Sequence, residues 1–140
     1  MQNKIYVDTN IVIDLCDSAR SLHEKSFAFI TSLTLQKSTE IFLNSDTLAT
    51  LFYILSNRST LNTEEVLEKM QFVHEIFTLV PVESEDVETA LNLCTDGSVS
   101  YRDYEDTMQY VCAKKVSADV IVTNDKGFVS LDIDLVGTKE

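Results

Sequence analysis

Aspartates in this sequence follow two apolar, β-branched stretches and occur at the start of a late helical segment. Asp8 directly follows the stretch KIYV, and Asp125 comes shortly after DVIVT. Asp103 and Asp106 are spaced so that a helix places them on one face. Carboxylate oxygens are the ligands that Mg²⁺ and Mn²⁺ prefer, and such sites keep open positions for a substrate phosphate. If these side chains meet in the fold, they predict metal-assisted hydrolysis of a phosphodiester.

Each carboxylate also has a structural interpretation. Asp8 could serve only as a helix cap, and the acids near Asp103 could serve only to complement the dipole of their helix. Crowding like charges is costly unless a cation lies among them, so a true cluster favours a metal. Asn10 is placed to cap the helix after Asp8, and Thr9 is placed to hydrogen-bond a carboxylate and fix its rotamer.

Short β-branched stretches alternate with amphipathic ones along the chain. The predicted strands are 4–7, 41–43, 79–82 and 119–123, with a weaker fifth near 133–136. Helical spacing of apolar residues begins at Leu48 and at Val87, and Asn62 with Glu65 has the spacing of a capping box. The predicted fold class is α/β, a four- or five-stranded parallel sheet flanked by helices on both faces. Ligands of such sheets bind beyond the carboxyl ends of the strands.

Composition indicates one globular domain, residues 1–140, without linker or repeat, since 44% of the residues are hydrophobic and only one is proline. No apolar run approaches the roughly 20 residues of a membrane helix, and the opening lacks an export signal, which predicts a cytoplasmic protein. Cys16, Cys94 and Cys112 lack paired spacing and are expected to be buried free thiols. The net charge of −12 argues against tight nonspecific binding of nucleic acid but suits a divalent-metal site or a basic partner.

The sequence resembles the PIN-domain nucleases, especially the VapC-type ribonuclease toxins of toxin–antitoxin pairs. The resemblance spans nearly the whole chain and rests on KIYVDTNIVIDL, NSDTLATLFYIL and DYEDTMQYVCAKKVSADVIVTNDKGF. It implies an endoribonuclease that uses Mg²⁺ or Mn²⁺ and acts as the toxin of such a pair. By position, Asp8, Asp106 and Asp125 match the catalytic, metal-binding acids, and Asp103 lies nearby as a further ligand. Two other matches, Asn10 and Thr123, are polar residues that support the pocket.

The middle helix departs from this pattern. The family usually has T-L-A-E-L, whereas residues 47–51 read TLATL, so Thr50 stands where glutamate is expected. Asp46 lies about one turn earlier on the same face and could supply the missing carboxylate, although it could equally be the helix N-cap. Thr50 could still bond a water on the metal.

The resemblance also implies an RNA substrate, a small antitoxin partner with a basic arm, and a homodimer formed through helices that hold 51–55 or 66–73. Membrane association is not expected. The basic side chains we would test for phosphate contact are Arg20, Lys25, Arg58, Arg102 and Lys126.

Three other classes of protein are alternatives to a nuclease. A catalytically weak or inactive PIN-like module that binds RNA or a protein partner is the main alternative, because Thr50 replaces an acid. A phosphotransfer receiver domain needs paired acids after its first strand, where this chain has Asp8 followed by threonine. A phosphatase with a DxD start is disfavoured because its second acid would fall at Asn10.

Overall fold

A computed structural model of the chain describes residues 3–97, 101 and 103–139. These residues form five strands and six helices, arranged along the chain as a strand–helix alternation. The elements are β1 (Asn3–Val7), α1 (Thr9–Cys16), α2 (His23–Thr34), β2 (Thr39–Asn44), α3 (Ser45–Arg58), α4 (Thr63–Ile76), β3 (Thr78–Val80), α5 (Ser84–Thr95), α6 (Tyr104–Lys115), β4 (Val120–Val122) and β5 (Asp134–Val136).

The strands form one parallel sheet in the order β3-β2-β1-β4-β5. This confirms the predicted α/β class, and the weakly predicted fifth strand is present as β5 at the edge. The central strand β1 pairs with β2 on one side and with β4 on the other, where Val7 lies opposite Val122. The chain therefore builds outward from β1 in both directions, and the strand order reverses between β1 and β4. Crevices at such a reversal are where open α/β sheets bind their ligands.

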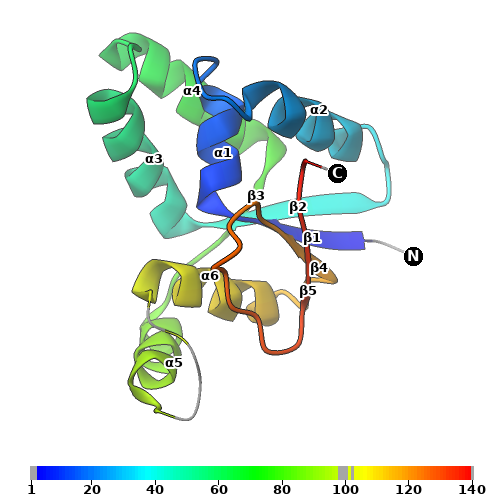
Figure 1. The fold of residues 1–140 in the computed structure, drawn as a ribbon, viewed down its shortest axis with the longest axis vertical. Coiled ribbons are helices and arrows are strands. Elements are labelled where there is room, and N and C mark those ends of the chain that lie inside the picture. Colours follow the sequence, from blue (N-terminus) through cyan, green and yellow to red (C-terminus); the bar gives the residue numbers. More distant parts are fainter. Residues whose placement is uncertain (1–2, 98–100, 102, 140) are drawn as a thin grey trace.

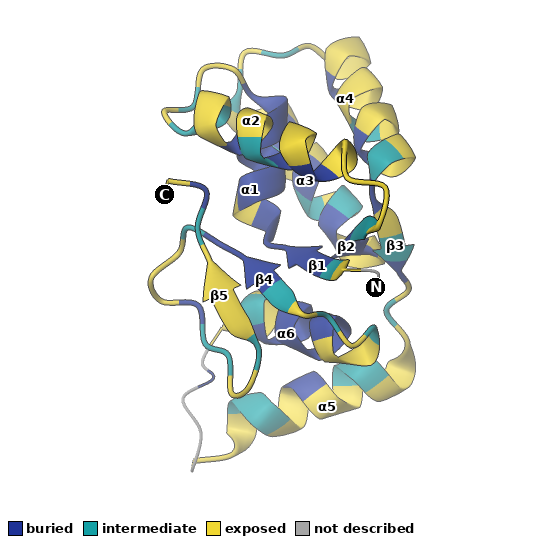
Figure 2. Ribbon diagram, turned by 90° about the vertical axis from the view of Figure 1, so that its right-hand side faces the viewer, coloured by how far each residue is buried: buried dark blue, intermediate teal, exposed yellow. Residues whose placement is uncertain are grey.

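Helices cover both faces of the sheet, as predicted. Figure 1 shows α1 to α4 on one face and α5 with α6 on the other. Alternate residues of β1 separate the two cores, because Ile5 and Val7 point to the first face and Tyr6 points to the second. The same alternation divides β2, where Ile41 and Leu43 join the first core. Figure 2 shows the buried central strands and the exposed outer surfaces of the helices.

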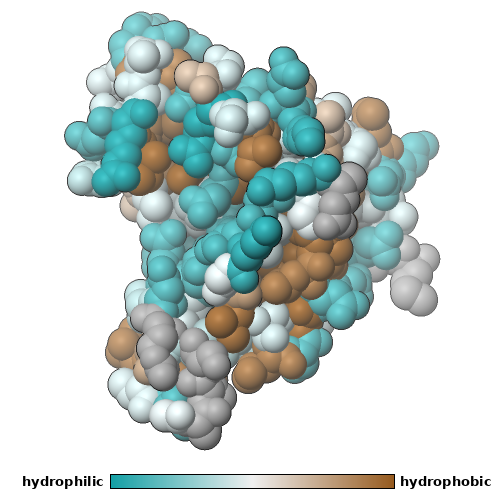
Figure 3. Space-filling view, viewed as in Figure 1, coloured by the Kyte–Doolittle hydropathy of each residue, from teal (hydrophilic) through white to brown (hydrophobic). Residues whose placement is uncertain are grey.

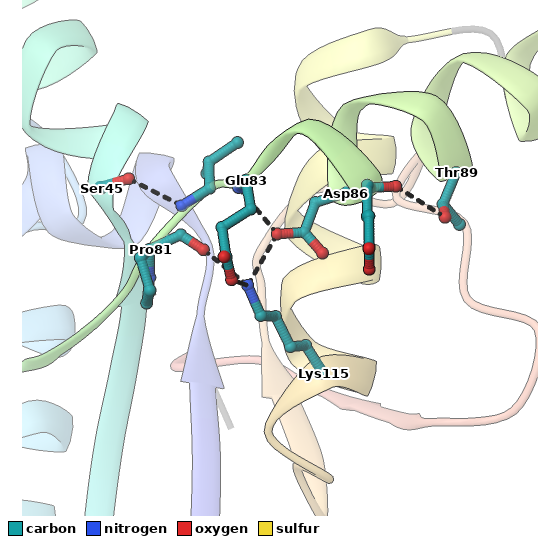
Figure 4. A network of polar contacts seen from close by, with 8 residues as sticks. Ser45, Pro81, Glu83, Asp86, Thr89 and Lys115 are labelled. Carbon is teal, nitrogen blue, oxygen red and sulfur yellow. Dashed lines mark hydrogen bonds and ion pairs between the residues drawn. The ribbon is translucent and has the colours of Figure 1, made fainter.

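A lysine at the end of α6 joins this helix to the start of α5. Lys115 Nζ donates to the carbonyl oxygen of Pro81 at 2.8 Å, to Glu83 Oε1 at 2.7 Å and to Asp86 Oδ2 at 2.8 Å (Figure 4). Glu83 and Asp86 also form the capping box of α5. The hydrogen bonds to Lys115 and the Glu83 backbone amide lower the pKa of Asp86 despite its partial desolvation. One cation thus fixes the pair of helices that covers the second face.

The edge strand β5 is exposed, with apolar side chains on the surface. Leu131, Leu135 and Val136 are 56%, 41% and 38% exposed, and Figure 3 shows apolar atoms gathered over this part of the molecule. In the described part of the chain, no helix has the length and hydrophobicity to cross a membrane.

The cysteines are free, as predicted. Cys16 and Cys112 are buried, and burial raises the pKa of each thiol to about 12. Cys94 is only half-buried, which corrects the expectation that all three are buried.

Replacing a core leucine of α3 should destabilise the fold far more than replacing its exposed neighbour. Leu51 is fully buried in the first core, so Leu51→Ala should lower the free energy of unfolding by about 2–5 kcal/mol. Tyr53 is 59% exposed, and Tyr53→Ala should change it by less than about 1 kcal/mol. Chemical denaturation measures both, and equal losses would contradict the assigned helix face.

Candidate active site

The candidate site lies where the carboxyl ends of β1 and β4 meet the start of α6. Asp8 follows the last residue of β1, and Thr123 and Asp125 follow β4, its neighbour in the sheet. In Figure 1 the first turns of α1 and α3 and the start of α6 lie around this end of β1. The sequence brings Asp8 and Asp125 together only if the strands before them are neighbours in the sheet. They are neighbours, because β1, followed by DTN, pairs with β4, followed by TND.

The carboxylate of Asp8 is buried and fully engaged by side-chain donors. Asp8 is 1% exposed, its Oδ1 accepts from Gln109 Nε2 at 2.9 Å and its Oδ2 accepts from Thr123 Oγ1 at 2.7 Å. Asp8 occupies the N-cap position of α1 but makes no side-chain capping hydrogen bond there. Burial raises the pKa of Asp8, the bonds from Thr123, Gln109 and the Asn10 backbone lower it, and the charge of Asp125 raises it again. Capping alone therefore does not account for this side chain, because its shortest bonds come from Gln109 and Thr123.

Gln109 of α6 lies between Asp8 and Asp106 and contacts both carboxylates. Its Nε2 donates to Asp8 and makes a longer contact of 3.5 Å to Asp106 Oδ1, while its Oε1 accepts from the backbone N–H of Thr9 at 2.9 Å. The Thr9 donor requires an acceptor, which directs the amide NH₂ toward the carboxylates. Gln109 is 1% exposed. The sequence analysis did not identify it, although it lies one helical turn after Asp106.

Asp106 is the acid whose charge is most strongly opposed by its surroundings. Burial, together with the charges of Asp8, Asp103, Asp125 and Glu105, raises its pKa to about 7. Asp103 is the N-cap of α6, since its Oδ1 accepts from the Asp106 backbone N–H at 3.1 Å. The structural role considered for Asp103 is thus present, alongside its proximity to the acids.

Asp125 is exposed but lies close enough to act on both other acids, since its charge raises the pKa of Asp8 and of Asp106. Its position is set by the turn after β4. The Asp125 backbone N–H donates to Thr123 Oγ1 at 3.0 Å, and its Oδ1 accepts from the Gly127 backbone N–H at 2.8 Å. Thr123 therefore holds Asp8 through one bond and the Asp125 backbone through another.

On the other side of Asp8, a pocket of about 140 Å³ separates α3 from α6. Asp46 and Thr50 both line it, together with Glu105 of α6. Asn44 caps α3 by accepting from the Thr47 backbone N–H at 3.0 Å, so the interpretation of Asp46 as N-cap is wrong. Glu105 was not singled out from the sequence. Its pKa is raised by partial burial and by the charges of Asp103 and Asp8, which places a further carboxylate beside Thr50.

The remaining predicted residues that the structure describes lie at exposed or partly exposed positions. Asn10 is inside α1 and exposed, so it does not cap that helix; it lines a second, larger pocket together with Arg20 and Asp125. Exposed positions hold Lys25, Arg58 and Lys126, and Arg102 falls outside the described residues.

The donor chemistry fits a divalent cation, although the acids are not arranged as a ready-made coordination shell. No group of three His, Cys, Asp or Glu side chains within the described ranges stands in ligating geometry. The amide of Gln109 lies between Asp8 and Asp106 where a cation would compete for the same oxygens. Hard carboxylate oxygens that raise one another's pKa are the donor set for Mg²⁺ or Mn²⁺.

The chain matches a known family, because the model of the PIN domain fits residues 5–134. The chain is a member of the PIN domain family. A curated relative, Ribonuclease VapC1 of Aquifex aeolicus, is 34% identical over 137 residues, covering 98% of this chain and 92% of the relative.

Solved structures share the fold at low sequence identity. VapBC2 of Rickettsia felis, bound to a promoter DNA fragment, matches with a TM-score of 0.70 and 16% identity over 96% of this chain and 98% of that one. VapC20 of Mycobacterium tuberculosis, described as a toxin that cleaves the sarcin–ricin loop, matches with a TM-score of 0.71 and 16% identity over 91% and 98%.

The raised pKa of Asp106 makes stability depend on pH. Its folded pKa of about 7 exceeds the ordinary value of 3.8, so the folded chain binds the proton more tightly and loses stability as pH rises through this range. Asp106→Asn should therefore raise the melting temperature of the metal-free protein at pH 8, with the difference shrinking toward pH 5. Thermal unfolding at both pH values measures this, and an equal effect at both would contradict it.

Removing the bridging amide should cost stability, because two buried groups lose a partner. Gln109→Leu leaves the Thr9 N–H and Asp8 Oδ1 unsatisfied, and should lower the free energy of unfolding by about 1–3 kcal/mol. Gln36→Leu, at an exposed position, is the matched control and should change it by about 0.5 kcal/mol or less. Denaturant titration compares them, and a silent Gln109→Leu would show that the bridge has no energetic role.

Proposed function

We propose that this chain is an Mg²⁺- or Mn²⁺-dependent endoribonuclease that hydrolyses RNA phosphodiester bonds as the toxin of a toxin–antitoxin pair. The observation that carries the proposal is the placement of Asp8, Asp106 and Asp125 at the strand-order reversal, where the charges of Asp8 and Asp125 both raise the pKa of Asp106. Membership of the PIN family and the name of the Aquifex relative support the same chemistry.

In this proposal Asp8, Asp106 and Asp125 hold the cation, with Asp103 next to them. When bound, the cation supplies positive charge at the reacting phosphate and makes water a stronger acid. Thr123 fixes the orientation of the Asp8 carboxylate, whereas the Gln109 amide must give way where the cation takes the Asp8 and Asp106 oxygens that it contacts. The Asp106 carboxyl, with a pKa of about 7, holds a proton for part of the time at neutral pH and must release it to bind the cation.

The pocket between α3 and α6 completes the proposed site. The family glutamate is replaced by Thr50, and the carboxylates available beside it are Asp46 and Glu105. Either carboxylate can bind the cation or a water molecule at this edge of the site. The pocket therefore still has acidic side chains, although Thr50 is not one of them.

We also propose a small antitoxin as protein partner and a homodimeric toxin. The related structures are described as VapBC assemblies, and the net charge of −12 suits a basic antitoxin arm. The predicted dimer interface uses the helices that hold 51–55 or 66–73, and within these ranges Leu51, Leu55, Val66 and Val73 are buried in the core. On the same helices, Phe52 of α3 and Phe72 of α4 are 40% and 39% exposed and are the better candidates for contact.

Asp8→Asn should abolish cation-dependent cleavage of single-stranded RNA. Loss of groups that only support a metal ligand typically costs 10–100-fold, so loss of a ligand should cost at least about a hundredfold. Glu64→Gln, an exposed acid on α4, is the matched control and should leave the rate unchanged. The assay follows cleavage of a labelled oligoribonucleotide with and without Mg²⁺ or Mn²⁺.

If the wild-type chain shows no cation-stimulated cleavage, the alternative of an inactive PIN-like binding module replaces the proposal. Cleavage by Asp8→Asn at the wild-type rate would exclude Asp8 as a ligand.

A further inference from the structure

An arginine shares a pocket with one of the acids of the site. The pocket has a volume of about 510 Å³ and lies between the segment after α1 and the turn after β4. Arg20 and Asp14 line it on one side and Asn124 and Asp125 on the other. Asp125, one of the three proposed metal-binding acids, lines this pocket, as does Asn10, two residues after Asp8.

An ion pair with the buried carboxylate of Asp14 holds the Arg20 guanidinium in place. Arg20 Nε donates to Asp14 Oδ1 at 2.6 Å, and the Asp14 side chain is only 6% exposed, whereas that of Arg20 is 38% exposed. The segment itself is fixed by the Arg20 backbone N–H, which donates to the Asp17 carbonyl oxygen at 3.1 Å. His23 Nδ1 lies 2.8 Å from the carbonyl oxygen of Asp14, which ties the start of α2 to the same place.

This arrangement leaves most of the guanidinium donors available. Across residues 3–97, 101 and 103–139, the only hydrogen bond or ion pair of the Arg20 side chain runs through Nε. The two terminal nitrogens present donors in a planar fork that matches two oxygens of a phosphate. Since the ion pair with Asp14 orients the fork in advance, less conformational freedom is lost when an anion binds.

The charges around the pocket favour a phosphodiester as the ligand. The chain carries 23 acidic and 11 basic residues, so an RNA strand approaching the acidic centre is repelled except where a cation faces it. Asp14 is buried behind the guanidinium, and Arg20 is the cationic side chain that lines this pocket. Asn10 and Asn124, which also line it, are neutral hydrogen-bonding groups able to contact the sugar or phosphate.

We propose that Arg20 binds a backbone phosphate of the RNA strand adjacent to the phosphate that is cleaved. The inference rests on the proposed ribonuclease function and adds a binding subsite to it. It assigns Arg20 a role in positioning the substrate. In this proposal the RNA strand runs from the pocket at Asn10 and Arg20, past Asp125, to Asp8 and Asp106. The simpler role, in which Arg20 only neutralises the buried Asp14, is the outcome that would overturn it.

The test pairs an arginine variant with RNA that lacks one charge at a time. Binding is measured by fluorescence anisotropy in Mg²⁺ with single-stranded oligoribonucleotides, each carrying one neutral methylphosphonate linkage at a different position. All proteins carry Asp8→Asn so that the RNA stays intact. The comparison is between Arg20 and Arg20→Gln in this background, a cycle that isolates the coupling between one side chain and one phosphate.

With Arg20 present, one neutral linkage should weaken binding roughly tenfold or more, as expected for a charge-assisted hydrogen bond. With Arg20→Gln, the same linkage should have no effect, and the slope of log affinity against log salt should fall by about 0.7. Lys37→Gln removes one exposed charge from the segment after α2 and should keep the response of the parent. If no linkage position distinguishes Arg20 from Arg20→Gln, the proposal is overturned.

Folding of the variant is checked separately. Arg20→Gln leaves Asp14 without its ion pair, so Asp14→Asn/Arg20→Gln provides a version without an unpaired buried acid. Both should give the same insensitivity to the neutral linkage. RNA binding is measured separately from cleavage, so the two proposals can fail independently. If the chain binds RNA through Arg20 but the wild type does not cleave RNA, the subsite stands and the ribonuclease function is rejected.

Discussion

The buried charge of Asp8 is the constraint on which the rest of this structure depends. A carboxylate that is 1% exposed is strongly destabilising unless donors satisfy it, and here the donors come from two distant parts of the chain. Thr123 reaches it from the end of β4 and Gln109 from α6, so the register of β4 against β1 and the position of α6 are both tied to one side chain. Moving either element would remove one of the two side-chain partners of this acid.

The polar contacts continue beyond Asp8 across the carboxyl edge of the sheet. Gln109 accepts from the Thr9 backbone, Thr9 Oγ1 lies 3.3 Å from Thr47 Oγ1, and Thr47 donates to Asn44 at the end of β2. Asn44 in turn donates to the Tyr6 hydroxyl at 3.0 Å. The ends of three adjacent strands are thus joined by buried hydrogen bonds. These buried hydrogen bonds resist small displacements of the Asp8 carboxylate oxygens.

Electrostatics supports the proposal that this edge of the sheet holds a cation. Burial and mutual repulsion raise the pKa of Asp106 to about 7, which means that the metal-free centre relieves its charge by keeping a proton. A divalent ion relieves the same repulsion more effectively and leaves the carboxylates ionised. The acidic balance of the whole chain then becomes compatible with an RNA substrate, because attraction is confined to the cation and to side chains such as Arg20 placed beside it.

Much of this fold follows from local sequence patterns. The five strands and the helices between them were predicted from β-branched runs and helical spacing, and the parallel sheet follows from their alternation. The capping box of Asn62 and Glu65 is present as predicted. The adjacency of the strands before Asp8 and Asp125 was only a condition at the sequence level, since strand order is not encoded in either segment alone.

The parts that sequence reasoning missed depend on contacts between distant segments. Gln109 looks like one more polar residue in a helix until Asp8 and Thr9 are placed against it. The cap of α3 is Asn44 and not Asp46, because β2 runs further than its apolar core and the helix begins directly after it. Glu105 lies on a different face from Asp103 and Asp106, and only the packing of α6 beside α3 brings it to Thr50. The roles assigned to the acids remain predictions.

Calorimetric titration of Mn²⁺ into the metal-free protein tests the central claim most directly, because it measures cation binding and proton release together. The account predicts saturable binding with a proton released from the acidic centre, and this release should be larger at pH 6.5 than at pH 8, where Asp106 is already ionised. Titrations in buffers of different ionisation enthalpy give the number of protons. Absence of saturable binding at both pH values would contradict the claim that these acids converge to hold a cation.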